Sequence, residues 1–252
     1  MNAAEAEARL AQELRSAGVR PGGVCLVHSS LSSLGTVPGG AETVVRGLLA
    51  ALGSEGTLLM PGLSYRHVHA GQPRFEVLAT PSNVGAIPEH FRQRPGTRRS
   101  LHPTHSVCGI GPLAAELLAG HQHDRTPCGP RSPFRLLPQV GGQLLMLGCG
   151  LKPNTSMHGV EELVEPPYLF GGVTTFELVD ELGVVMRREY RCHGFQGWGQ
   201  HYERVAGMLR PEEARQGTVL QAEVWVLEAR AVWQAGEAAL RRDPLCLVHR
   251  VP

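Results

Sequence analysis

Two apolar runs separated by an amphipathic segment constrain the fold of this chain more than any other feature. The first run, "VCLV", is followed by the polar residues "HSS" at 28–30, and the second, "TLLMP", covers 57–61. Between them, "AETVVRGLLAALG" has the spacing of an amphipathic helix and ends in glycine. A strand, a helix and a strand in this order predict a sheet with parallel members, and the 28–30 segment is expected in a loop at the end of the first strand.

Similar patterns predict the remaining elements. We expect helices over 1–18, 85–96, 112–121 (with Pro112 at its first position) and 229–242, strands over 105–111 and 143–150, and an irregular stretch over 62–83. Residues 173–190 alternate in polarity around a turn at 181–183, which predicts an antiparallel hairpin. The expected fold is α/β, a central mixed sheet flanked by helices on both faces with an additional antiparallel hairpin region in the C-terminal half, forming one domain over 1–252.

Charge and cysteine usage indicate the kind of partner. The chain has 24 Lys and Arg, 23 Asp and Glu and a formal charge of +1, and no run of one sign indicates nucleic acid or a membrane surface. No apolar stretch approaches the roughly 20 residues that span a bilayer, and the first residues do not resemble a signal peptide. Six widely spaced cysteines without a C-x-x-C pair are typical of reduced thiols. We therefore expect a cytoplasmic protein with a small-molecule partner.

The segment "NTSMHGVEE" (154–162) combines a helix start with a histidine and carboxylates. Asn154 or Thr155 would cap the helix, and His158 would lie in its first turn. Helical spacing then places Glu161 and Glu162 within reach of the imidazole. A carboxylate that holds one ring nitrogen leaves the other free to take a proton. The competing interpretation is an ordinary helix start with a partly buried histidine.

The sequence signals for other chemistries are weaker. The segment "CGIGPLA" (108–114) contains G-x-G-x-x-A, but no acid follows at the spacing of a dinucleotide site, so helix–strand packing is favoured. No G-x-S-x-G is present. Cys128, in a Gly/Pro-rich loop, is a candidate nucleophile. The histidines lack metal-site spacing and no metal is expected, although Cys128, Cys192 and His193 form the first set to inspect.

Four segments together resemble one known family. They are "LVHSSLSSLG", "RRSLHPTHSVCGIG", "TPCGPRSPF" and "GQLLMLGCGLKPNTSMHGVEE". Their order and spacing are similar to those of the antibiotic N-acetyltransferase family, that of the aminoglycoside 3-N-acetyltransferases. The resemblance is strong over 10–168 and looser beyond.

This resemblance implies acetyl-CoA-dependent acyl transfer to an amine through a ternary complex. It makes His158 the catalytic base and Glu161 its orienting partner. The segments that resemble the family's coenzyme A-binding stretches contain His28, Ser29, Ser30, Leu31, His105, Ser106, Val107 and Thr155. The implied partners are coenzyme A and a small-molecule amine, and a homodimer is a candidate assembly.

One segment departs from the family pattern. Many aminoglycoside-modifying members carry acidic residues where this chain reads "RREYRCHGFQGWGQHYER" (187–204), which is basic and aromatic. A basic and aromatic surface, here called the basic wall (187–204), binds a polycationic sugar less well, so a different amine is a second candidate acceptor. Two further hypotheses are a ping-pong enzyme acylated at Cys128 and a non-catalytic coenzyme A-binding protein.

Overall fold

The strand, helix and strand predicted over 24–61 are present in the computed structural model, which describes residues 1–251. They are β1 (Val24–Ser29), α2 (Gly40–Leu52) and β2 (Thr57–Pro61). Strand β1 pairs in parallel with β2 on one side and with β6 (Gln143–Leu147) on the other. The predicted parallel members of the sheet are therefore confirmed.

Antiparallel strands extend this parallel centre to seven strands, in the order β10-β11-β6-β1-β2-β5-β4. The added strands are β4 (Arg98–Arg99), β5 (Val107–Ile110), β10 (Ala214–Val219) and β11 (Ala222–Glu228). Strand β5 is antiparallel to β2, and β11 is antiparallel to β6. The central sheet is mixed, as expected.

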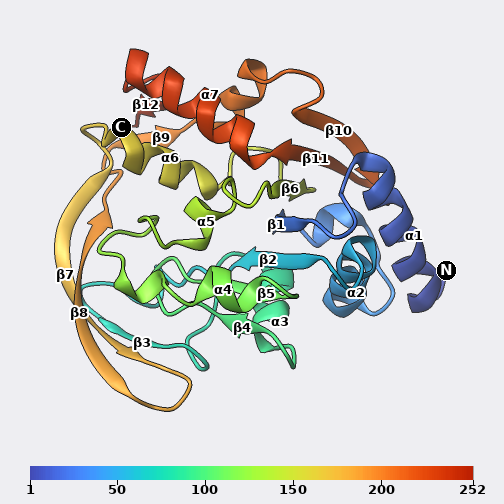
Figure 1. Cartoon of the computed structure of the whole chain (residues 1–252), viewed down its shortest axis with the longest axis horizontal. Helices are drawn as coiled ribbons and strands as arrows, with labels where there is room; N and C mark the ends of the chain where they lie inside the picture. Colours follow the sequence, from blue (N-terminus) through green and yellow to red (C-terminus); the bar gives the residue numbers. More distant parts are fainter. Residues whose placement is uncertain (252) are drawn as a thin grey trace.

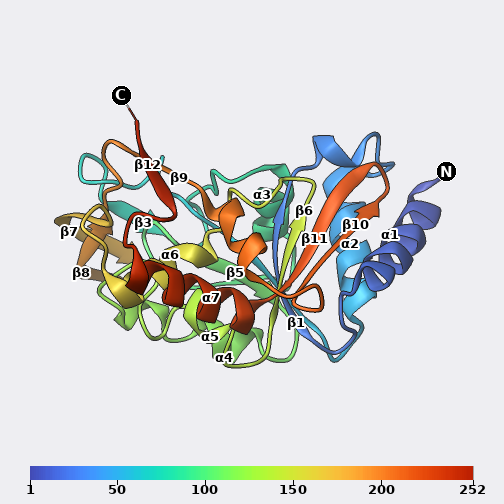
Figure 2. The same ribbon diagram turned by 90° about the horizontal axis from the view of Figure 1, so that it is seen from above.

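Helices cover both faces of the sheet, and two apolar cores result. One face carries α1 (Ala3–Ala17), α2 and α3 (Ala86–Gln93), and the other carries α4 (Ala114–Leu118), α5 (Pro133–Leu136), α6 (Ser156–Val164) and α7 (Ala229–Arg242). Alternate residues of β1 enter the two cores, Cys25 and Val27 on the first face and Val24 and Leu26 on the second. Figure 2 shows α1 and α2 on one side of β1, β6 and β11, with α6 and α7 on the other.

The predicted hairpin forms a second, curved sheet. Strands β7 (Phe170–Val179) and β8 (Val185–His193) pair antiparallel, and β3 (Arg74–Glu76) pairs in parallel with β7. Figure 1 shows this sheet at the end of the molecule far from α1. A two-stranded sheet joins β9 (Trp198–Gln200) to β12 (Val248–Arg250), and the 3-10 helices are η1 (Ser32–Leu34), η2 (His121–His123) and η3 (Tyr202–Met208).

Several local expectations were wrong. The helix expected over 112–121 is only α4, with Leu113 as its N-cap, so Pro112 lies outside it. The Leu113 N–H donates to Thr57 Oγ1 at 3.1 Å, which ties this residue to the sheet. Strands β10 and β11 lie in a region without any predicted element, and β3 lies within the stretch expected to be irregular.

The glycines of the G-x-G-x-x-A segment serve packing. A Cβ at Gly109 would lie 2.7 Å from Leu59 Cδ2 and 3.3 Å from the Ala114 Cβ, so α4 approaches the sheet closely only because this position has no side chain. The packing interpretation was therefore correct.

Candidate active site

Helix α6 brings His158 and Glu161 together, as their spacing predicted. The helix follows β6 and begins at Ser156, so His158 lies in its first turn. The N-cap is Thr155 without a side-chain bond, while Asn154 Oδ1 accepts the Ser156 N–H at 3.2 Å. His158 Nδ1 lies 3.2 Å from Glu161 Oε2.

Two tyrosines hold Glu161 from outside the helix. Glu161 is 0% exposed, and it accepts the Tyr168 hydroxyl at 2.9 Å and the Tyr202 hydroxyl at 2.8 Å. Burial, followed by the charge of Glu161, raises the pKa of both tyrosines, so the hydroxyls keep their protons and donate. The buried carboxylate thereby has the hydrogen bonds that a buried charge requires.

These contacts define the tautomer of His158. Its Nδ1 lies 2.9 Å from the Tyr202 oxygen, and the Tyr202 proton is already directed to Glu161. Nδ1 therefore carries the ring proton and donates to the Tyr202 oxygen and to Glu161, and Nε2 keeps a free lone pair. The side chain of His158 is 16% exposed, so this nitrogen belongs to a partly open group.

Glu162 does not share in holding His158, contrary to the expectation from helical spacing. Its Oε1 lies 2.8 Å from both the Cys128 N–H nitrogen and His193 Nε2, and its Oε2 accepts the Thr126 hydroxyl at 2.6 Å. Burial raises the pKa of Glu162 to about 7 against the lowering effect of these bonds. One turn of α6 therefore presents two carboxylates, each paired with a different histidine.

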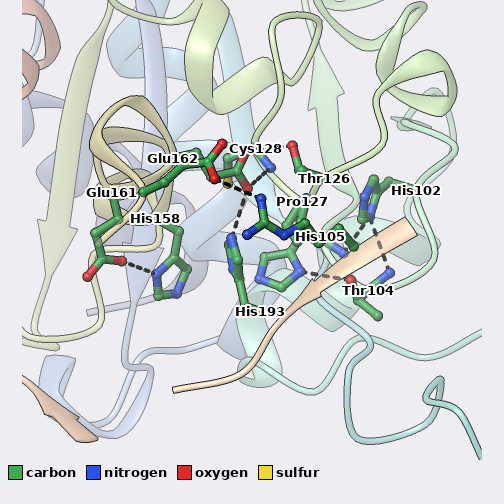
Figure 3. A network of polar contacts seen from close by, with 12 residues as sticks. His102, Thr104, His105, Thr126, Pro127, Cys128, His158, Glu161, Glu162 and His193 are labelled. Carbon is green, nitrogen blue, oxygen red and sulfur yellow. Dashed lines mark hydrogen bonds and ion pairs between the residues drawn. The ribbon is translucent and has the colours of Figure 1, made fainter. Parts of the chain in front are cut away.

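Three imidazoles lie side by side at this point (Figure 3). The ring centroid of His193 is 5.2 Å from that of His158 and 5.2 Å from that of His105. The Phe195 ring lies 4.9 Å from His158. Burial lowers the pKa of His105 and of His193 well below the usual range, so both rings are neutral near pH 7.

A cavity of about 100 Å³ adjoins the start of α6 and is lined in part by His28, Ser29, Cys149 and Thr155. His28 Nε2 accepts the Thr155 N–H at 3.1 Å, so the ring proton is on Nδ1. Burial lowers the pKa of His28 to about 3, which keeps the ring neutral. His28 Nδ1, Ser29 Oγ and Asn154 Nδ2 are buried without a partner among the residues described. The start of α6 thus offers unused polar groups beside an empty space.

The remaining residues of the expected coenzyme A site do not line this cavity. Ser30 Oγ accepts the Ser33 hydroxyl at 2.9 Å, and Leu31 packs against the first core. Ser106 Oγ accepts Arg99 Nε at 2.9 Å, and Val107 is fully buried in the second core. Of the expected site residues, the structure brings His28, Ser29 and Thr155 together at the cavity and places His105 beside His158.

Cys128 is an unfavourable nucleophile. It is fully buried, and burial, followed by the charge of Glu162, raises the pKa of its thiol well above the usual range. Its backbone, not its sulfur, contributes to the cluster by binding Glu162. Within residues 1–251, no group of three or more His, Cys, Asp or Glu side chains has the arrangement of a metal site.

The basic wall expected over 187–204 is partly neutralised. The Arg191 guanidinium lies 2.7 Å from Glu165 and stacks 3.7 Å from the centroid of Phe170. Arg191 is therefore already paired. Across the part of the chain described, no helix is both long and apolar enough to traverse a lipid bilayer.

Sequence reasoning missed Tyr168, Tyr202, Thr126 and the role of His193. Tyr168 lies seven residues after Glu161, beyond the end of α6, whereas Tyr202 lies 44 residues from His158 and His193 lies 31 residues from Glu162. The available signals were the aromatic and histidine content of the 187–204 segment and the place of Thr126 in "TPCGPRSPF".

Sequence relatives cover most of the chain. The family model described as aminoglycoside 3-N-acetyltransferase matches residues 26–241. Aminoglycoside N(3)-acetyltransferase IV of Salmonella sp is 30% identical over 250 residues, which cover 96% of this chain and 90% of that relative. Aminoglycoside N(3)-acetyltransferase VII of Streptomyces paromomycinus is 34% identical over 176 residues, but this match covers 63% of the chain and only 61% of the relative.

Solved structures agree in fold. A variant of the aminoglycoside acetyltransferase AAC(3)-IVa in complex with a gentamicin superimposes with a TM-score of 0.79 at 28% identity, over 96% of this chain and 91% of that one. The binary complex of AAC-IIIb with CoASH gives a TM-score of 0.79 at 25% identity, over 94% and 96% of the two chains. This chain therefore belongs to the aminoglycoside 3-N-acetyltransferase family.

Proposed function

We propose that this chain transfers the acetyl group of acetyl-CoA to an amine of an aminoglycoside-type antibiotic, with His158 as general base. The observation that carries the proposal is the free Nε2 of His158, whose other nitrogen is held by Tyr202 and Glu161. Relatives that bind CoASH and a gentamicin support the two substrates.

The reaction is a direct transfer. The amine lone pair attacks the thioester carbonyl carbon, and the new C–N bond leaves an excess proton on nitrogen, which His158 Nε2 accepts. Glu161 stabilises the resulting imidazolium through Nδ1, and its two tyrosine partners keep it in place. As the C–S bond breaks, the imidazolium returns its proton to the coenzyme A sulfur.

The negative charge that develops on the thioester oxygen requires a donor. Thr155 N–H is already bound to His28, and Ser30 N–H donates to the Leu147 carbonyl at 2.9 Å. Thr155 lines the cavity, and its hydroxyl makes no capping hydrogen bond at the start of α6. We assign the contact with the thioester oxygen to this hydroxyl.

We place part of the pantetheine arm in the cavity beside His28 and Ser29. The arm carries amides, and His28 Nδ1, Ser29 Oγ and Asn154 Nδ2 are the polar groups left to bind them. Ser29→Leu fills the cavity and removes one hydroxyl, so the Kd for coenzyme A should rise at least about tenfold, about 1.4 kcal/mol. Titration calorimetry measures this change, with the exposed Ser32→Leu as the control. Unchanged affinity in a folded Ser29→Leu protein would show that the arm lies elsewhere.

Direct transfer is tested by intact-mass measurement after rapid mixing with acetyl-CoA alone. We expect no acetyl group on the protein, because the Cys128 thiol is buried and stays protonated. Adding an aminoglycoside should release coenzyme A, and Cys128→Ala should retain most of this activity. An acetyl adduct at Cys128 that an amine then removes would establish the ping-pong mechanism instead.

A further inference from the structure

His193 has one ring nitrogen that the protein uses and one that it does not. Its side chain is 5% exposed, and its Nε2 lies 2.8 Å from Glu162 Oε1. Its Nδ1 is buried and has no hydrogen-bond partner in the part of the chain described. Leaving a buried polar atom unpaired is destabilising, which favours a missing partner.

The contacts of Glu162 define which nitrogen is the acceptor. Thr126 Oγ1 and the Cys128 N–H both donate to Glu162, and above its pKa of about 7 the ionised carboxylate has no proton to give, so it accepts from its third neighbour as well. His193 Nε2 thus carries the ring proton. Because burial keeps the ring neutral, Nδ1 presents a lone pair and no hydrogen.

This lone pair lies in the same cluster as the proposed base. The ring centroids of His193 and His158 are 5.2 Å apart, and Figure 3 shows the two rings beside each other. Two acceptors that each hold one hydrogen of a primary amine, at about 2.9 Å from its nitrogen, lie roughly 5 Å apart. The centroid separation of the two rings is of this size, so one amine nitrogen can lie within reach of both histidines.

We propose that His193 Nδ1 binds the acceptor amine, accepting one of its two N–H hydrogens while His158 Nε2 faces the other. This inference rests on the proposed acetyl transfer. With both hydrogens held, the nitrogen lone pair has one direction left, toward the thioester carbon. On attack the C–N bond forms and His158 takes its proton, whereas His193 keeps its protonation state throughout. Glu162 acts through His193 by holding Nε2, and is a positioning residue.

Two replacements of His193 separate its two nitrogens. In His193→Gln the side-chain amide reaches the place of Nε2, so it keeps a bond to Glu162 and loses the acceptor at Nδ1. In His193→Asn the shorter amide lies near the place of Nδ1, so its oxygen can accept from the amine while the bond to Glu162 is lost. We expect His193→Gln to raise the acceptor KM and lower kcat, with kcat/KM for the acceptor falling at least about 30-fold, about 2 kcal/mol. His193→Asn should retain several-fold more activity.

The Kd for coenzyme A serves as the internal control for folding. Neither variant should change the Kd for coenzyme A, because His193 does not line the cavity beside His28. The matched control is His90→Gln on α3, which also removes an imidazole whose Nε2 lies 2.8 Å from a glutamate, Glu42. This control should leave the acceptor KM unchanged.

The opposite ranking would overturn the inference. If His193→Gln equals wild type while His193→Asn is impaired, the residue serves only to hold Glu162. Equal losses in both variants, or no loss in either, also contradict an acceptor role for Nδ1.

A measurement on the unaltered protein provides a second test. The 15N resonance of His193 Nδ1 should shift when gentamicin binds, and an unchanged resonance at saturation counts against the contact. Failure of acetyl transfer itself is distinguishable, because wild type would then release no thiol with any amine.

Discussion

His158→Ala is expected to lower kcat by about 10²–10⁴-fold while leaving the Kd for acetyl-CoA unchanged. Its imidazole combines a free ring nitrogen with a partly exposed side chain, at 16%, whereas His105 and His193 are buried. Its removal takes away the proton acceptor and leaves the cavity beside His28 intact. Thiol release at saturating acetyl-CoA measures kcat, and titration calorimetry measures binding.

The exposed His123→Ala provides the control for this experiment, since the same change is made on the surface. If His158→Ala retains activity within about threefold of wild type, its loss of activity is far smaller than the removal of a general base should cause. In that case His158 is structural, and the proposed mechanism is wrong.

A steep loss of stability in mild acid is the second large effect expected. Five buried histidines have pKa values lowered by burial, to about 3 for His28 and about 4 for His121. The five are His28, His102, His105, His121 and His193. In the unfolded chain these rings take up protons near pH 6.5, whereas in the folded protein they stay neutral, so the free energy of unfolding falls as pH falls below about 6.5.

Two carboxyl groups act in the opposite direction. The pKa of Glu162 is raised to about 7 and that of Asp124 to about 6, so the folded protein holds these protons between about pH 4.5 and 6 while the unfolded chain does not. Five imidazoles less two carboxyl groups leave about three protons taken up on unfolding. The corresponding slope is on the order of 4 kcal/mol per pH unit.

Urea unfolding at several pH values between about 6.5 and 5 measures this slope. His121→Gln should reduce it by about one proton, because a buried ionisable ring is removed, and the exposed His123→Gln two residues further on should not. A free energy of unfolding that is flat over this range would contradict the neutral, buried state of the histidine cluster.

The sequence predicted the parts of the site that local spacing determines. The His158–Glu161 contact spans three residues of one helix, and α6 follows from helix formers after "NTS". The parallel pairing of β1 with β2 follows from the alternation of strand and helix, and the β7–β8 hairpin from the two-residue period around its turn. The helix and hairpin contacts are close in the sequence, and the β1–β2 pairing follows from the order of the elements.

The remaining features depend on contacts between distant segments. Tyr202 reaches His158 only because η3 returns to α6, and His193 reaches Glu162 only because β8 ends beside it. Strands β10 and β11 join the sheet through the pairing of β11 with β6, which lies far earlier in the chain. Arg99 donates to the Ser106 hydroxyl, and Val107 lies in the second core, through contacts that join separate segments. No period of polarity in the sequence encodes these tertiary contacts.

The most direct test of the central claim is identification of the product formed from acetyl-CoA and an aminoglycoside. Gentamicin and apramycin, each incubated with the wild-type protein, would be analysed by mass spectrometry and NMR while released coenzyme A is counted. The account predicts one acetyl group on the 3-amino nitrogen of the antibiotic for each coenzyme A released. Coenzyme A release without acetylated antibiotic, or no release from a protein that binds acetyl-CoA, would contradict it.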